Sequence, residues 1–258
     1  MESIRVTEIQ HFSVNDGEGI RSTVFLAGCP LRCAWCSNPE TWEAEPDAKK
    51  FPPEGRRLLG RSMTVDEILE ALRRQSIFHR SSSGGVTWSG GEPFFRPDRL
   101  RALVKACAAA GIDQAVESSA QFDWEACSDI VENLNFLFLD LKHIESDVHR
   151  RWTGLGNETI LANLARIGAG AARTVVRIPL VAGVNDGEDN LRRSARFVLN
   201  VMRSPRMEVL PYHWLGMAKY EALGLGERFA EFSPIAGKDL ARAEAILEGE
   251  GIEVVRYR

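Results

Sequence analysis

Three closely spaced cysteines are the residues of this sequence best suited to chemistry. Cys29, Cys33 and Cys36 lie directly after the apolar run 23–27. Three thiolates can occupy three corners of a metal centre and leave the fourth corner open for a cofactor or a substrate, as catalytic zinc sites also do. The cysteines alone leave two other interpretations open, a zinc site completed by a distant histidine and thiols that bind no metal.

The composition is typical of a soluble globular protein. The chain has 258 residues, of which 44% are hydrophobic and 26% charged, and its net charge is −4. A mildly negative net charge does not indicate a broad surface for nucleic acids or acidic membranes. The first residues lack the apolar segment of a signal peptide, and no apolar run approaches membrane-spanning length. We therefore expect a cytoplasmic protein, with neither a nucleic acid nor a membrane among its partners.

The number and positions of the cysteines argue against a disulfide framework. There are five, and three of them lie within eight residues. This pattern favours a metal site in a reducing compartment. Cys107 and Cys127 fall on apolar helical stripes, where a cysteine usually behaves as a small buried hydrophobe.

Short apolar strands alternate with helices along most of the chain. An extended segment is expected at 4–14, and residues 37–62, rich in proline and glycine, should be irregular. The expected strands are 22–27, 86–88, 114–117, 136–139, 174–178 and 207–210, with a further extended segment at 252–256. The expected helices begin at Thr64 with a capping box, at Pro97 and after Asp123, and then occupy about 157–168, 188–202 and 238–249. Short, nearly continuous apolar strands are typical of parallel sheets, so we expect a single α/β domain over residues 1–258, a wound sheet or barrel of six βα units.

Polar residues occur at or near the ends of successive expected strands. They are Cys29, Glu92, Glu117, Asp140, Arg177 and His213. In a parallel barrel the loops after the strands gather at one rim, where catalytic groups are found. Each residue also has an ordinary structural explanation, such as a helix cap, a surface ion pair or a satisfied buried histidine. Polar residues at the ends of several successive strands favour a common site, because a buried ionisable group must be paired or functional.

The stretch Gly90-Gly91-Glu92 suits the head group of an amino acid. Two glycines let the backbone approach a ligand closely, and their carbonyls can accept hydrogen bonds from an ammonium group. A neighbouring carboxylate adds a charge-assisted attraction. The ligand's own carboxylate would need a cation, for which Lys142 and His213 are candidates. A plain Gly-Gly turn remains the alternative for the two glycines alone.

Six motifs in order give the sequence a family resemblance that covers nearly the whole chain. They are Val14–Arg21, Gly28–Glu40, Ser89–Pro93, Leu139–Lys142, Arg177–Pro179 and Leu210–His213. With them the sequence resembles the glycyl-radical-enzyme activating enzymes, a radical S-adenosylmethionine (SAM) family of the pyruvate formate-lyase activating type. The resemblance implies a partial (β/α)6 barrel, one [4Fe–4S] cluster held by Cys29, Cys33 and Cys36, and SAM as the cofactor.

The resemblance also implies roles around SAM. Gly90, Gly91 and Glu92 would hold the methionine amino group, and Asp140, Leu141, Lys142 and His213 would surround the methionine moiety. Trp35 and Ser37 would lie beside the cofactor, with the Trp35 ring near the adenine, and Arg177 would help to orient it. Glu117 and Ser118 occupy the place of an Asp-Thr pair that binds a monovalent cation together with the residue matching Asp140; the longer Glu117 sets this chain apart there.

The implied reaction needs two protein partners. An external one-electron donor such as flavodoxin or ferredoxin would reduce the cluster, and the activated cofactor would remove hydrogen from a backbone glycine of a partner glycyl radical enzyme. Residues 37–63 contain no cysteine, so the ferredoxin-like insert of some relatives is missing or has been replaced, and one cluster must suffice. We expect an anaerobic enzyme and a monomer that meets its partner through residues 37–62 and 214–232.

Two alternatives remain at this point. The first is a radical SAM enzyme that acts on a small molecule, similar to a deazapurine synthase, which would enclose its substrate. The second, more remote, is a zinc-binding interaction module, which would not need the Gly-Gly-Glu and Asp-x-Lys motifs.

Overall fold

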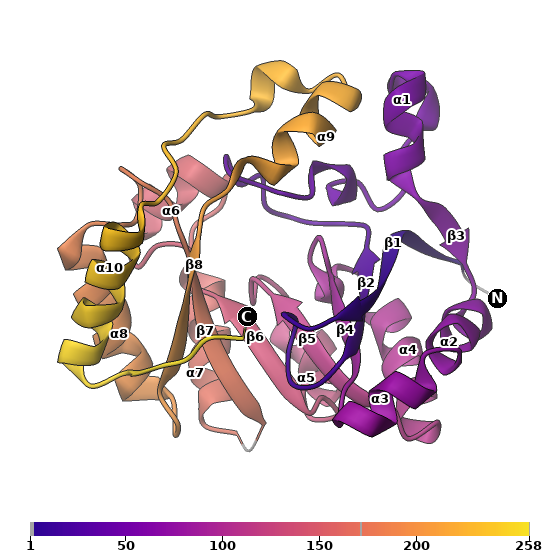
Figure 1. Cartoon of the computed structure of the whole chain (residues 1–258), viewed down its shortest axis with the longest axis horizontal. Helices are drawn as coiled ribbons and strands as arrows, with labels where there is room; N and C mark the ends of the chain where they lie inside the picture. Colours follow the sequence, from indigo (N-terminus) through magenta and orange to yellow (C-terminus); the bar gives the residue numbers. More distant parts are fainter. Residues whose placement is uncertain (1–2, 171, 258) are drawn as a thin grey trace.

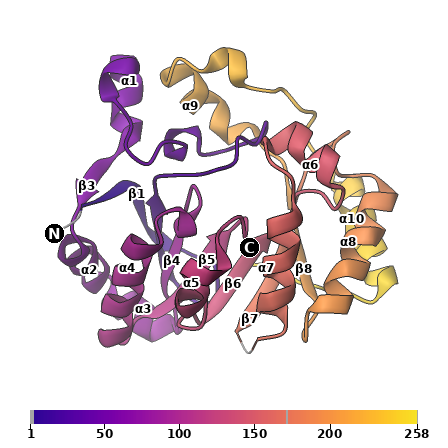
Figure 2. The same ribbon diagram turned by 180° about the vertical axis from the view of Figure 1, so that it is seen from behind.

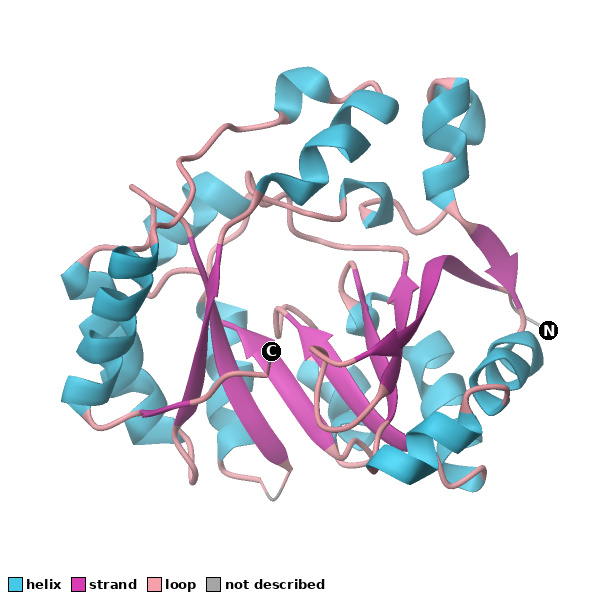
Figure 3. Cartoon of the chain, in the orientation of Figure 1, coloured by secondary structure: helices cyan, strands magenta, loops and turns pink. Residues whose placement is uncertain are grey.

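A single curved sheet organises the chain. The computed structural model describes residues 3–170 and 172–257 and shows nine strands in the order β3-β1-β2-β4-β5-β6-β7-β8-β9. The sheet bends around a central space and does not close (Figures 1 and 3). The strands are β1 (Ile4–Ser13), β2 (Arg21–Leu26), β3 (Arg61–Met63), β4 (Gly85–Gly90), β5 (Asp113–Ser118), β6 (Phe136–Asp140), β7 (Arg173–Leu180), β8 (Arg206–Pro211) and β9 (Glu253–Val254).

The six expected parallel strands are confirmed as the continuous block β2-β4-β5-β6-β7-β8. Each pairs in parallel with the next, and β9 adds a short parallel edge. β1 pairs antiparallel with both β2 and β3, so the N-terminal extended segment forms a strand of the same sheet. Because β2 and β4 to β8 run in the same direction, their carboxyl ends share one rim. This architecture is the partial barrel that the sequence predicts.

The helices cover the outer face of this sheet, as the rear view shows (Figure 2). They are α1 (Pro53–Arg56), α2 (Val65–Arg73), α3 (Ser76–Ser82), α4 (Pro97–Ala109), α5 (Trp124–Val131), α6 (Ser146–Thr153), α7 (Glu158–Gly168), α8 (Glu188–Val201), α9 (Met217–Ala222) and α10 (Gly237–Glu250). Short 3₁₀ turns are η1 (Pro39–Thr41), η2 (Ala48–Lys50), η3 (Arg57–Leu59), η4 (Pro93–Phe95), η5 (Trp214–Gly216) and η6 (Gly226–Arg228). Among the described residues, no helix has the length and apolar character needed to cross a membrane.

The helix starts follow the local chemistry of the sequence. Thr64 accepts a hydrogen bond from the Glu67 amide at 3.2 Å and donates its own amide to the Glu67 carboxylate at 2.7 Å, which confirms the capping box of α2. Asp123 caps α5 through the Glu125 amide. Four helices were not predicted, α1, α3, α6 and α9, because they bury so few side chains that no apolar periodicity marks them. Of these, α1 lies within residues 37–62, which were expected to be irregular.

The core has an outer and an inner part. Between sheet and helices lies one large apolar cluster, which includes Cys107 and Cys127, both 1% exposed as predicted. Inside the curve of the sheet, Phe136 and Phe138 belong to a smaller cluster that packs against Tyr257. The C-terminal tail therefore crosses the inner face of the sheet and fills part of the barrel interior.

Candidate active site

A cavity of about 570 Å³ opens at the carboxyl ends of the parallel strands and contains most of the predicted site residues. This volume is in the usual range for small-molecule sites. The predicted residues on its wall are Cys29, Cys33, Trp35, Cys36, Ser37, Gly90, Gly91, Glu117, Ser118, Asp140, Lys142, Arg177 and His213. The other two, Glu92 and Leu141, are each 1% exposed and do not line the cavity.

The cysteine loop is fixed by backbone hydrogen bonds on two sides. The Gly28 amide donates to the Thr41 carbonyl at 2.6 Å, while the Arg32 amide donates to the Thr153 carbonyl at 2.7 Å at the end of α6. Gly28 has a φ of +110°, and a Cβ there would lie 2.4 Å from the Phe95 ring. Only glycine is compatible with this turn, which brings the loop from β2 over the cavity.

The three thiols of the cysteine loop line one cavity. The other two cysteines lie in the outer core. Within residues 3–170 and 172–257, no three His, Cys, Asp or Glu side chains are grouped tightly enough to hold one metal ion. Three separate thiols on one wall are therefore compatible with a cluster that leaves one iron open.

Burial keeps these thiols protonated in the metal-free chain. It raises the pKa of Cys33 to about 12 and also raises the pKa of Cys29 and of Cys36. Binding a cluster must displace these protons, so metal affinity is coupled to pH. The Asn38 amide donates to the Cys36 sulfur at 3.4 Å, a contact of the kind that adjusts cluster potentials.

Gly90, the last residue of β4, and Gly91 allow the backbone to approach the start of the cysteine loop closely. Gly90 has a φ of +105°, and a Cβ on it would lie 2.5 Å from the Leu26 amide nitrogen. A Cβ on Gly91 would lie 2.4 Å from the Gly28 carbonyl oxygen. The end of β4 is thus packed directly against the start of the cysteine loop.

The buried side chain of Glu92 holds residues Ser118 and Ser119 in place through hydrogen bonds. Its carboxylate accepts hydrogen bonds from the Ser118 hydroxyl at 2.7 Å, from the Ser119 amide at 2.9 Å and hydroxyl at 2.5 Å, and from the Phe94 amide at 3.3 Å. Burial raises the pKa of Glu92 above its usual range, and these donors oppose that shift. In this arrangement Glu92 fixes the residues that follow β5.

Asp140, the last residue of β6, and Lys142 form an ion pair on the cavity wall. Their side chains are 2.7 Å apart, and the Lys142 side chain is 10% exposed. Although burial opposes protonation, Asp140 and Cys33 raise the pKa of Lys142 above its ordinary value. The lysine therefore carries a positive charge beside the cysteine loop. His213, at the rim, is exposed and caps η5 by accepting from the Leu215 amide.

Arg177 lies between two carboxylates on the wall of the cavity. It is 2.5 Å from Glu117 and 2.8 Å from Glu208, and its guanidinium lies 3.4 Å from the centroid of the Phe138 ring. Burial raises the pKa of Glu117 and the Arg177 charge opposes this shift. The alternative explanation of Arg177 as one half of a surface ion pair does not hold, because both of its acidic partners line the cavity.

The side chains expected at a monovalent cation site have protein partners here. Glu117 binds Arg177 and accepts from the Ser89 hydroxyl at 2.6 Å, and Ser118 donates to Glu92. Asp140 is paired with Lys142. These oxygens are therefore not gathered as a cation ligand set in this arrangement, and the cation stays a prediction.

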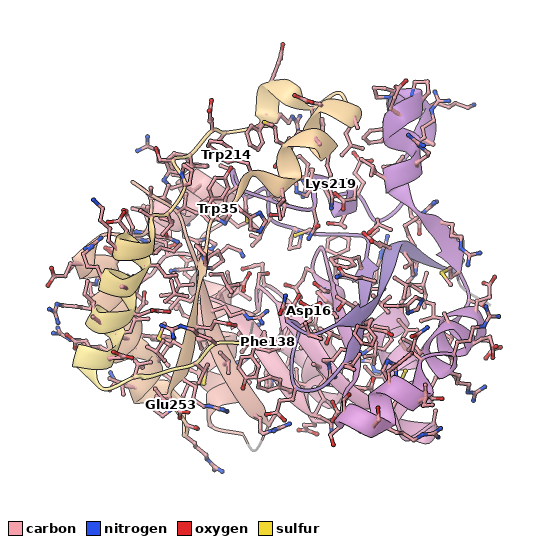
Figure 4. All side chains as sticks on the ribbon, in the orientation of Figure 1. Asp16, Trp35, Phe138, Trp214, Lys219 and Glu253 are labelled. Carbon is pink, nitrogen blue, oxygen red and sulfur yellow. The ribbon has the colours of Figure 1, made fainter. Side chains whose placement is uncertain are left out.

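The segment from Tyr212 to Phe232 folds over the cysteine loop. The Phe232 ring makes edge contacts with Trp35, Trp152 and Tyr212. On α9, the Lys219 ammonium binds the Glu40 carboxylate at 2.5 Å, next to the end of the loop. Figure 4 shows Trp35, Trp214 and Lys219 at this upper rim, and Asp16 and Phe138 lower, inside the curve of the sheet.

Several residues of the cavity wall were not predicted as site residues, among them Asp16, Glu208 and Tyr257. Asp16 accepts hydrogen bonds from the Ser13 and Thr23 hydroxyls and lies within a motif that was recognised without a role. Glu208 could have been noticed as an acid within a buried apolar strand. Tyr257, whose amide donates to Glu208 at 2.8 Å, has no local signal, because only the path of the tail brings it there.

Comparison with known proteins agrees with this geometry. Residues 23–195 match the family described as Radical SAM superfamily. The chain is 33% identical to the isethionate sulfite-lyase activating enzyme of Oleidesulfovibrio alaskensis, with 83% of this chain and 85% of the relative covered. The chain belongs to the radical SAM superfamily, among the glycyl radical enzyme activating enzymes.

Two further relatives support this assignment. The radical SAM chain is 30% identical to the (2S)-3-sulfopropanediol dehydratase activating enzyme of Klebsiella oxytoca, with 85% of each chain covered. A crystallised domain of a pyruvate-formate lyase-activating enzyme from Bacteroides vulgatus is 29% identical, with a TM-score of 0.56 over 67% of this chain and 98% of that one. Radical SAM proteins use a [4Fe–4S] cluster and SAM, which this membership assigns to the chain. The zinc-binding interaction module is thereby set aside.

Proposed function

We propose that this radical SAM protein activates a partner glycyl radical enzyme by removing hydrogen from one of its backbone glycines. The observation that supports this most is the gathering of three cysteine thiols, the Gly90–Gly91 turn and the Asp140–Lys142 pair around one cavity. When bound, the cluster and SAM supply the reductive cleavage and the hydrogen-abstracting 5′-deoxyadenosyl group. The chain itself has to bind, orient and exclude water.

Each part of the wall has a task in this proposal. Cys29, Cys33 and Cys36 hold the single cluster. The carbonyls of Gly90 and Gly91 accept from the methionine ammonium group. Because Glu92 is occupied by Ser118 and Ser119, it would contribute its negative charge and the shape of the wall more than a direct contact.

Other residues of the cavity wall would bind the methionine carboxylate and the adenine of SAM. Lys142 supplies the cation for the methionine carboxylate, with Asp140 and the rim residue His213 beside it. The Leu141 amide donates to the Arg177 carbonyl at 2.8 Å and so fixes the backbone between Asp140 and Lys142. The Trp35 ring, 8% exposed, and Ser37 form the adenine side.

Arg177 acts in this scheme through Glu117 rather than by direct contact. Its guanidinium is shared between Glu117 and Glu208, so it sets the position and charge of the Glu117 carboxylate. Glu117 and Ser118 would need to leave their present partners to bind a monovalent cation.

The partner loop would enter at the rim beside His213. Trp214 is 44% exposed, Leu215 77% and Met217 43%, which leaves apolar surface next to the cavity mouth. We place the partner contact there and on residues 37–62. The contact should be modest in area, since the two proteins must separate afterwards. The protein would act as a monomer in the cytoplasm, with one domain, under anaerobic conditions.

A reconstitution assay tests the proposed function. Reduced protein carrying its cluster is mixed with SAM and a candidate glycyl radical enzyme without oxygen. We expect 5′-deoxyadenosine, methionine and a doublet glycyl radical signal in the partner's electron paramagnetic resonance spectrum. The Cys33→Ala variant is the control and should give none of these products. Cofactor cleavage with a modified small molecule and no protein radical would favour the small-molecule alternative.

A second assay tests the cofactor wall. Asp140→Ala should weaken SAM binding by about ten- to hundredfold while the cluster is retained, because a charge-assisted interaction is lost. Calorimetric titration measures the affinity and iron analysis measures the cluster. An unchanged affinity would remove Asp140 from the proposed binding wall.

A further inference from the structure

A group of unpaired cations lies on the surface behind the cysteine loop. Lys49 and Lys50 on η2, Arg56 on α1, Arg57 on η3 and Arg61 on β3 are all exposed. None of these five residues, here called the basic face, takes part in an ion pair with a described residue. Residues 47–61 contain these five cations and two exposed acids, Asp47 and Glu54, which leaves a net charge of +3 in a chain whose total is −4.

The basic face borders a hollow in the surface. A cavity of about 740 Å³ is lined by Arg56, Arg57, Arg61 and Arg74, together with Glu8, Glu67 and Glu70. Two of these acids have local partners, since Glu70 pairs with Arg74 at 3.4 Å and Glu67 caps α2. The hollow therefore presents arginines whose charges are available to an acidic group from outside.

One element of the basic face, η3, contacts the segment that follows the cysteine loop. η3, which carries Arg57, packs against η1. Directly behind, the Thr41 carbonyl accepts from the Gly28 amide at 2.6 Å, and the Trp42 carbonyl accepts from the Cys29 amide at 3.3 Å. Figure 1 shows α1 beside α9 at the same upper side of the sheet. None of the five basic residues lines the active-site cavity, so a protein bound to them can leave the cavity wall free.

We infer that the basic face docks a small acidic protein that delivers one electron to the cluster. This inference rests on the proposed function, which requires an external reductant. The carrier would lose one electron and the cluster would gain it, with no other group transferred. Electron-transfer encounters are small and weak, and opposite charges steer them, so a charged patch beside the cluster suits such a partner better than an apolar one. This assignment divides the contact surface proposed above: the five basic residues within 37–62 serve the electron carrier, and the apolar rim at Trp214, Leu215 and Met217 is left to the glycyl radical enzyme.

Charge reversal on the basic face tests the inference. In the holoprotein, Arg56→Glu, Arg57→Glu and Arg61→Glu are combined, and flavodoxin, an acidic one-electron carrier, serves as the probe. We expect at least about tenfold weaker flavodoxin binding in a fluorescence titration at low ionic strength. Added salt at about 0.15 M should weaken binding to the unchanged protein and have little effect on the variant.

A matched variant controls for net charge. Arg80→Glu, Lys105→Glu and Arg203→Glu change the same number of exposed charges, and no ion pair with a described residue is known for these three. This variant should bind flavodoxin as the unchanged protein does. Arg56 also donates to the Ala48 and Phe51 carbonyls, so its replacement could disturb the structure around α1. The double variant Arg57→Glu, Arg61→Glu retains these hydrogen bonds and tests the charges alone.

Cluster reduction provides a second readout. The electron paramagnetic resonance signal of the reduced cluster should develop more slowly in the basic-face variants with flavodoxin hydroquinone, and at an unchanged rate with dithionite. Unchanged flavodoxin binding in these variants, equal losses in the matched variant, or a loss of glycyl radical enzyme binding instead would each overturn the inference. If dithionite-reduced protein fails to cleave SAM, the proposed function fails, while the flavodoxin titration still decides the docking surface.

Discussion

At the scale of single residues, the cavity depends on charges that are buried together. Arg177 is 6% exposed and forms ion pairs with two carboxylates, one of which, Glu208, is 1% exposed. The Glu208 carboxylate is held in turn by the Tyr257 amide. Such an arrangement tolerates the loss of one member poorly, because the remaining charges are then buried without compensation.

Replacing Arg177 by methionine should therefore destabilise the fold strongly. We expect a loss of about 3–5 kcal/mol in the free energy of unfolding at neutral pH, measured by urea denaturation. Arg177→Lys retains the charge without the planar fork and should lose less. A loss below about 1 kcal/mol for Arg177→Met would show that solvent compensates the two carboxylates.

Glu92 should give the protein a pH-dependent component of stability. Burial raises its folded-state pKa above the unfolded value of about 4.3, so the folded chain retains the proton to higher pH. The contribution is complete below the unfolded pKa and is lost as pH rises through the folded pKa. Urea denaturation between about pH 4 and 8 should show the unchanged protein losing stability relative to Glu92→Gln as pH rises. Parallel stability curves would contradict the raised pKa.

At the scale of elements, the segment from Tyr212 to Phe232 is connected to the cysteine loop at a few points. Gly216 packs on the backbone, because a Cβ there would lie 3.0 Å from the Cys36 carbonyl oxygen. Lys219 reaches Glu40, which is 6% exposed. Burial raises the pKa of Glu40 and the Lys219 charge opposes this shift. The ion pair thus joins α9 to the residues just after the cysteines.

Removing the lysine should loosen both elements while the sheet stays intact. In Lys219→Met the Glu40 carboxylate is left buried without its cation, which favours opening of the segment. We expect faster amide hydrogen exchange in residues 28–42 and 213–232, with unchanged exchange in β5 to β7. Lys219→Met combined with Glu40→Gln should recover part of the protection. A uniform change across the chain would indicate global destabilisation instead.

At the scale of the whole molecule, the metal site and the main core are separate. The cysteine loop is held by backbone hydrogen bonds at the rim, whereas the large apolar cluster lies between the sheet and the outer helices. Stability of the cluster-free chain should therefore depend little on the three thiols.

Replacing Cys29, Cys33 and Cys36 together by alanine should remove the metal and keep the fold. The unchanged protein, purified without oxygen, should contain about four irons per chain, and the triple variant none. The free energies of unfolding of the two cluster-free chains should agree within about 1 kcal/mol, measured by circular dichroism in urea. About eight irons in the unchanged protein would reveal a second cluster, and unfolding of the variant would show that the thiols support the core.

The sequence by itself determined the elements and the chemistry at their ends. Strand and helix periodicity, the capping box at Thr64 and the burial of Cys107 follow from neighbours within a few residues, so a local pattern is enough. Because parallel strands end at one rim, the polar residues that follow them were predicted to share a site. The structure brings Cys29, Glu117, Asp140 and Arg177 to one cavity.

Only the tertiary structure decided how those side chains are used. Glu92 binds Ser118 and Ser119 instead of lining the cavity, and Arg177 is shared between two acids. The ion pair between Lys219 and Glu40 joins residues 179 positions apart. Such contacts join residues that are far apart in the sequence, so the residues next to either partner do not predict them. The helices α1, α3, α6 and α9 were missed for the same reason, since they are stabilised by tertiary packing and not by an apolar stripe of their own.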